Sequence, residues 1–137
     1  MLNEDSLILH EKLAGKINMV SKISFAKIKK EKLLELVYTP GVAHVCNTIA
    51  KDKSLLSKYT MKSKSVAIIS DGTAVLGLGN IGPEAALPVL EGKAMLLKEI
   101  AGVDTYPISV KTTDTNHLIQ TIKAVAVTFG AIMLEDV

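Results

Sequence analysis

Lys93 falls where a helical pattern calls for an apolar residue. At ~3.6 residues per turn, its face of the helix also carries Val89, Leu90, Leu96, Leu97 and Ile100. A lysine in such a stripe either reaches to solvent, pairs with a carboxylate, or lies desolvated as a possible general base. The neighbouring Gly92 is unfavourable inside a helix and indicates the close approach of a ligand there. The sequence therefore makes Lys93 a candidate base.

Tyr38 is the second candidate, because it stands at a helix break just before Thr39-Pro40-Gly41. A phenol fixed there can face a cleft, although a half-buried core tyrosine fits the residue type equally well. If the side chains of Tyr38 and Lys93 meet, the phenol as acid and the amine as base would form a matched pair.

Glu135 and Asp136 form the third candidate group, two adjacent carboxylates directly after a strand-like run. Neighbours in a regular strand point to opposite faces, so both could bind one ion only where the strand ends. Hard oxygen ligands suit Mg²⁺ or Mn²⁺, whereas a solvated pair of acids is the simpler alternative. The single cysteine, Cys46, excludes an internal disulfide. The three histidines lack ligand spacing and are expected to be structural or on the surface: His10, His44 and His117.

Gly77, Gly79 and Gly82 match the spacing of a dinucleotide-binding loop, with Asp104 as the acidic residue about twenty positions later. Two prolines weaken that interpretation. Pro83 removes an N–H that would face a pyrophosphate, and Pro88 interrupts the following helix. We therefore expect a glycine-rich turn on the floor of a substrate cleft, with a standalone dinucleotide-binding module as the alternative.

Composition limits the remaining possibilities. The 137 residues are 48% hydrophobic and 22% charged, which is typical of one globular domain. A net charge of +2 gives no reason to expect nucleic acid or a membrane surface as a partner. All sixteen basic residues are lysine, so no arginine is present to bind a carboxylate in bidentate fashion. The acidic start lacks the features of a signal peptide, and a cytoplasmic protein is expected.

The pattern of elements predicts a three-layer α/β domain: a small, largely parallel sheet flanked by helices, preceded by an N-terminal helical arm. Buried strands are expected over 66–70, 105–110 and 131–134, and Thr73–Leu78 could form the return arm of a hairpin. Helices are expected over 6–13 and 25–37, and a short helical turn over 54–60. A further helix is expected from Pro40 to about 51, with Thr39 as its N-cap, and another from an Asp114 cap to about 128. The longest should run from Pro83 to 102 and restart at Pro88.

These motifs together resemble the malic enzyme family, specifically the N-terminal domain of its smaller bacterial-type members. The similarity covers the chain from about Gly15-Lys16-Ile17 onward. Its markers are Tyr38-Thr39-Pro40-Gly41-Val42-Ala43, the run from Ser70 to Pro83, Pro88-Val89-Leu90-Glu91-Gly92-Lys93, Phe129-Gly130 and Leu134-Glu135-Asp136.

The resemblance implies oxidative decarboxylation of malate to pyruvate and CO₂, with NAD or NADP and a divalent cation, Mg²⁺ or Mn²⁺. It makes Lys93 the general base for the C2 hydroxyl and Tyr38 the acid that protonates the enolpyruvate carbon. It makes Glu135 and Asp136 two of three metal ligands. Ala74 stands where larger members carry a substrate-binding arginine, and His44-Val45 replaces a usual Glu-Pro.

The resemblance also sets expectations for domain organisation. Residues 1–137 would form the N-terminal domain, with 1–60 a mainly helical arm and 61–137 the α/β core. The nucleotide-binding domain and the third metal ligand would lie beyond it, so this chain alone would be inactive. A homodimer is expected, and a non-catalytic oligomerisation domain is the alternative from another class.

Overall fold

The computed structural model describes residues 2–26 and 29–137 and divides into two compact units. One unit comprises Met1–Asn18 with Lys64–Val137, and the other comprises Met19–Ser63. No helix in the described ranges has the length and apolar character needed to cross a membrane.

The larger unit is built on a three-stranded parallel sheet. Its strands are β1 (Ser65–Ser70), β2 (Asp104–Ser109) and β3 (Ala131–Leu134), in the order β2-β1-β3. Val66 of the central strand pairs with Thr105 on one side and with Ala131 on the other. Because all three strands run the same way, their carboxyl ends meet at one edge of the sheet. The predicted strands and their parallel arrangement are confirmed.

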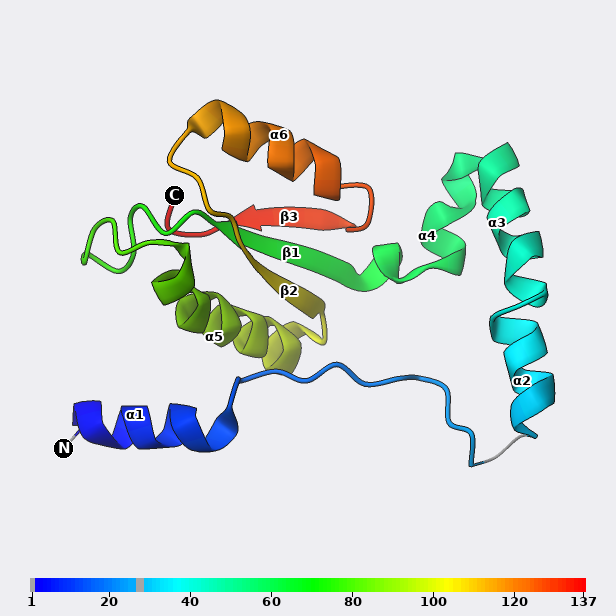
Figure 1. Ribbon diagram of the computed structural model, residues 1–137, viewed down its shortest axis with the longest axis horizontal. Coiled ribbons are helices and arrows are strands. Elements are labelled where there is room, and N and C mark those ends of the chain that lie inside the picture. Colours follow the sequence, from blue (N-terminus) through cyan, green and yellow to red (C-terminus); the bar gives the residue numbers. More distant parts are fainter. Residues whose placement is uncertain (1, 27–28) are drawn as a thin grey trace. The chain divides into compact units, whose positions relative to one another are not determined.

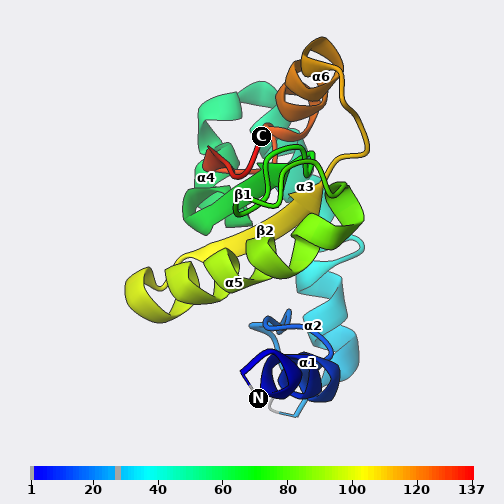
Figure 2. The same ribbon diagram turned by 90° about the vertical axis from the view of Figure 1, so that its left-hand side faces the viewer.

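Helices cover both faces of this sheet, which gives the three layers expected from the sequence (Figures 1 and 2). Alternate residues of β1 divide between the two sides. Ile68 packs with buried residues of α5 (Pro83–Ala101), whereas Ala67 and Ile69 pack with Leu118 of α6 (Thr115–Val125). The side chain of Asp114 accepts a hydrogen bond from the N–H of Asn116 and caps α6 as predicted. The unit also contains α1 (Leu2–Leu13).

Helix α5 passes through Pro88 without a break, so the predicted restart there is wrong. Pro88 removes only the hydrogen bond that an N–H at this position would donate to the carbonyl of Glu84. Ala86 and Leu90, on either side of Pro88, are fully buried in the cluster with Ile68. Packing of these neighbours against the sheet offsets the single lost bond. The helix ends at Gly102, which has a φ of 67°.

The smaller unit consists of short helices: α2 (Lys30–Val37), α3 (Gly41–Lys51), the 3₁₀ turns η1 (Lys53–Leu55) and η2 (Met61–Lys64, whose last residue belongs to the larger unit), and α4 (Leu56–Tyr59). The predicted helix over 25–37 is therefore shorter than expected, because Phe25 lies in a turn. Ile28, an apolar residue within the predicted range, lies outside the described residues.

Thr39 does not cap α3, contrary to the prediction, because Pro40 occupies the N-cap position and no side chain caps the helix. The N–H of Val42 instead donates to the carbonyl of Tyr38. Gly41 allows this tight connection, since a Cβ there would lie 2.5 Å from the carbonyl oxygen of Glu35. The close approach of the two helix ends thus replaces side-chain capping.

Candidate active site

The carboxyl edge of the sheet brings two of the candidate groups together. Nζ of Lys93, on α5, lies 3.0 Å from Oε1 of Glu135, the residue that follows β3. Glu135 continues the pairing of β3, since its N–H donates to the carbonyl of Ile69. The ion pair therefore joins the helix on one face of the sheet to the end of an outer strand.

Of the three possibilities for Lys93, the structure has the one in which it pairs with a carboxylate. Its side chain is 40% exposed and that of Glu135 18% exposed. The apolar face predicted around Lys93 is correct for Leu90, which is buried, and for Val89 and Leu97, which pack against the same cluster. It is wrong for Leu96 and Ile100, which are exposed.

Asp136 lies beyond the end of the regular strand. Only there, by the prediction from the sequence, could two adjacent carboxylates bind the same ion. β3 stops at Leu134, and Asp136 has a φ of 53°. Its backbone carbonyl accepts hydrogen bonds from the N–H of Ala74 and from Oγ of Ser70. These bonds hold the residue against the loop that follows β1, and Figure 1 shows the C-terminus beside that loop.

Asp136 also carries the observation that bears on a metal. Its Oδ2 is buried and has no hydrogen-bond partner among the described residues. A buried carboxylate oxygen without a partner costs free energy. A divalent cation bound to it would offset this cost, because Mg²⁺ and Mn²⁺ prefer oxygen ligands. Glu135 and Asp136 thus fit part of a metal site. Within the described ranges no group of three His, Cys, Asp or Glu residues could complete it.

The loop over residues 71–82 joins β1 to α5 and lies at the same edge of the sheet. No return strand forms in it, so the predicted hairpin arm is wrong. Instead the N–H of Val75 donates to the carbonyl of Gly79, and Val75 itself is fully buried under α5. The buried side chain holds the loop down, which leaves its neighbours Leu76 and Leu78 exposed.

Close approach in this loop involves Gly72 and Gly82. A Cβ on Gly72 would lie 2.2 Å from the carbonyl oxygen of Gly82, and both N–H groups of Ile81 and Gly82 donate to the carbonyl of Gly72. Gly77 and Gly79 face open space, and their φ of 77° is what calls for glycine. The sequence singled out Gly77, Gly79 and Gly82 for the close-approach turn, and the structure adds Gly72 as the glycine that the backbone of Gly82 approaches.

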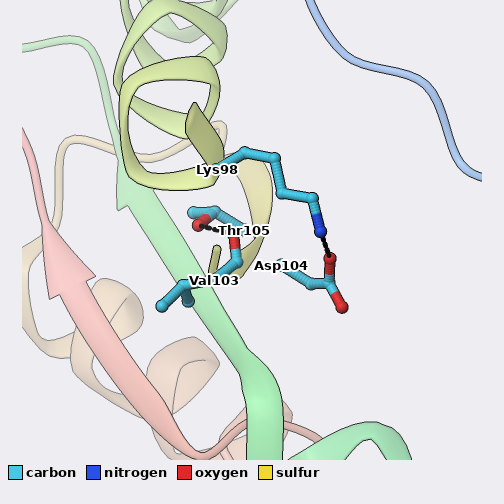
Figure 3. A network of polar contacts seen from close by, with 4 residues as sticks. All are labelled: Lys98, Val103, Asp104 and Thr105. Atoms are coloured by element: carbon cyan, nitrogen blue, oxygen red, sulfur yellow. Dashed lines mark hydrogen bonds and ion pairs between the residues drawn. The ribbon is translucent and has the colours of Figure 1, made fainter. Parts of the chain in front are cut away.

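Asp104 stands at the wrong edge of the sheet for a dinucleotide fingerprint. It is the first residue of β2 and pairs with Ser65, whereas the glycine loop leaves β1 after Ser70. Five strand steps of ~3.3 Å separate the two ends. Asp104 instead binds Nζ of Lys98 at 2.6 Å (Figure 3), where α5 ends and β2 begins. This placement argues against the standalone dinucleotide module.

Tyr38 is the C-cap residue of α2 in the smaller unit and is 67% exposed. The predicted helix break at this residue is confirmed. Its pairing with Lys93 would join the two units and stays a prediction. His44 and His117 are exposed, and His10 is half-buried with Nδ1 2.8 Å from the carbonyl of Ser6.

Comparison with known proteins decides the family. Residues 15–120 match the family described as malic enzyme, N-terminal domain. The chain belongs to the malic enzyme family. The resemblance that the sequence motifs indicated is thereby confirmed.

Individual malic enzymes match nearly the whole chain. The NAD-dependent malic enzyme of Geobacillus stearothermophilus is 52% identical over 136 residues, which are 99% of this chain and 27% of that protein. The bifunctional malic/malolactic enzyme of Bacillus subtilis is 49% identical over 99% of this chain and 32% of its own length. The crystal structure of malic enzyme from Pyrococcus horikoshii superposes with a TM-score of 0.93 at 47% identity, covering 99% of this chain and 31% of that one. The chain thus spans about a third or less of each relative.

Proposed function

We propose that this chain supplies the substrate-binding and catalytic domain of a malic enzyme, which converts malate to pyruvate and CO₂ with NAD or NADP. The observation that carries the proposal is the ion pair between Lys93 and Glu135. It joins the candidate base to a candidate metal ligand at the carboxyl edge of a parallel sheet, where ligands of α/β proteins bind.

In this proposal Nζ of Lys93 would take the proton of the C2 hydroxyl in the substrate complex, and NAD or NADP, when bound, would supply the hydride acceptor. The bond from C3 to the departing carboxylate then breaks and releases CO₂. The phenol of Tyr38 gives its proton to C3, which yields pyruvate. Lys93 takes up one proton and Tyr38 releases one, so the number of protons is conserved over the reaction.

Glu135 and Asp136 would hold Mg²⁺ or Mn²⁺, with the buried Oδ2 of Asp136 as the best-supported ligand. When bound, the cation supplies Lewis-acid polarisation of the C2 oxygen. Oε1 of Glu135 already contacts Lys93, so the same carboxylate would orient the base and help to hold the cation.

The proposal is tested by exchange of the matched region. Residues 1–137 replace the corresponding segment of the Geobacillus malic enzyme, and malate-dependent reduction of NAD and of NADP is measured with Mn²⁺. We expect turnover in the hybrid and a loss of about 10³-fold in kcat for Lys93→Ala. Lys98→Ala, on the same helix but at the opposite edge of the sheet, is the matched control. A hybrid that folds but has no activity, or a Lys93→Ala variant with unchanged kcat, would contradict the proposal.

We also propose a second copy of the chain as partner and the cytoplasm as its location. Exposed apolar side chains on α1 support association: Leu7, Ile8, Leu9 and Leu13. Surface of this kind is typical of protein contacts. Light scattering of the chain tests the dimer, and a strict monomer at high concentration would count against it.

A further inference from the structure

The segment from Gly15 to Ile17 lies along α5 at the turn that precedes Lys93. The N–H of Lys16 donates to Oε2 of Glu91 at 3.2 Å, and its Nζ donates to the carbonyl of Pro88 at 2.7 Å. Ile17 packs against the buried cluster that contains Leu90. One short segment therefore contacts the helix through a backbone donor, a charged side chain and an apolar side chain.

Two residues lower the intrinsic helical stability of the contacted turn of α5. Pro88 has no N–H, so the carbonyl of Glu84 loses its helical donor. Gly92 adds the backbone entropy cost of a glycine inside a helix. Both residues lie within the two turns that lead to Lys93. Without a contact from another segment, this part of α5 would hold the amine of Lys93 less firmly in place.

Gly92 lies beside the same contact. A Cβ at this position would lie 4.0 Å from Nζ of Lys16, which is an ordinary van der Waals distance. A ligand that approaches Gly92 closely, as the sequence suggested, stays a prediction.

We propose that Lys16 is a positioning residue, which braces the turn from Pro88 to Gly92 and thereby sets where the amine of Lys93 lies. The role of Lys93 in this inference rests on the proposed function. The brace itself does not, because it concerns the order of the helix. A base must be held close to its productive geometry, and a displacement of about 1 Å can cost up to about a hundredfold in rate.

Amide hydrogen exchange of the chain tests the brace directly. In Lys16→Ala we expect the amides of Gly92, Lys93 and Ala94 to exchange about fivefold faster, as for the loss of one hydrogen bond. Lys16→Arg retains a donor and should restore protection. Lys12→Ala, an exposed lysine of α1, is the matched control. Unchanged exchange in Lys16→Ala would overturn the proposal.

The hybrid enzyme tests the link to Lys93. Lys16→Ala should lower kcat about tenfold and leave KM for malate within about twofold, because Lys16 positions the base and does not touch substrate. Lys16→Arg should recover most of the rate. If Lys93→Ala abolishes turnover while Lys16→Ala retains the full kcat, the positioning role is wrong and the proposed function stands. If Lys93→Ala is fully active, the proposed function fails, and so does the link to Lys93.

Discussion

Nζ of Lys93 and Oε1 of Glu135 lie 3.0 Å apart across the carboxyl edge of the sheet. The two residues come from separate motifs, one in the middle of a long helix and one after the last strand. Parallel strands with a helix packed on one face bring them together, because β3 and α5 both border β1. Their contact gives this part of the molecule a candidate base and a candidate metal ligand at one place.

Replacing the two carboxylates separates their roles. In the hybrid enzyme, Asp136→Asn should weaken Mn²⁺ binding at least about tenfold, because the buried oxygen loses its charge. Glu135→Gln should weaken it as well and also remove the ion pair with Lys93. Isothermal titration with Mn²⁺ measures both effects.

Glu84→Gln is the control for these variants, since Glu84 is an exposed carboxylate at the start of α5 that contacts Lys111 at 3.6 Å. Equal Mn²⁺ affinity in Asp136→Asn, Glu84→Gln and the unaltered protein would remove Asp136 from the metal site.

Tyr38→Phe should slow the last step and spare the first. The phenol is proposed to act after hydride transfer and CO₂ release, so a single turnover in the hybrid should still form NADH rapidly. Pyruvate should appear about a hundredfold more slowly. Absorbance at the nicotinamide band follows NADH, and rapid-quench analysis follows pyruvate.

The control for Tyr38→Phe is Tyr59→Phe, which removes another exposed tyrosine hydroxyl from the same unit. An equal loss of hydride transfer and of pyruvate formation in Tyr38→Phe would contradict its assignment as the acid for C3.

Gly72→Ala should destabilise the larger unit severely, by about 3 kcal/mol or more, because the new Cβ meets the backbone of Gly82 and the residue has a φ of 74°. Gly79→Ala is the matched variant, since it has a similar φ but open space around it. It should cost only about 1–2 kcal/mol of backbone strain. Urea unfolding measures both, and equal losses would show that close approach adds nothing at Gly72.

Asp52 provides a prediction on pH. Its pKa is held below the ordinary value of 3.8, first by the hydrogen bond from the Ser54 hydroxyl and second by that from the Ser54 N–H. Because the folded-state pKa is depressed, the stabilisation is present above pH 3.8 and is lost as the pH falls through the folded value.

Ser54→Ala should therefore raise the pKa of Asp52 toward 3.8 and lessen the acid-dependent loss of stability. NMR titration of the Asp52 carboxyl measures the shift. Ser57→Ala, at an exposed position in α4, is the control, and an unchanged Asp52 pKa in Ser54→Ala would exclude the hydroxyl as its main cause.

The sequence by itself determined the elements whose signals are local. The run of β-branched residues over 66–70 identified the central strand, the predicted range 131–134 coincides with β3, and Asp114 caps α6. These features depend on side-chain pattern and on hydrogen bonds within a few residues, which any reader of the chain can recognise. The order of the motifs likewise identified the malic enzyme family.

Tertiary structure decided what depends on distant neighbours. Pro88 continues α5 because Ala86 and Leu90 are buried against the sheet, and Gly41 lets two helix ends approach so that Thr39 need not cap. Lys93 pairs with Glu135, and Lys16 contacts Pro88 and Glu91 of α5. Each of these contacts joins residues that are separated along the chain. In the larger unit, packing against the sheet and α5 brings them together, and local sequence pattern carries no record of it.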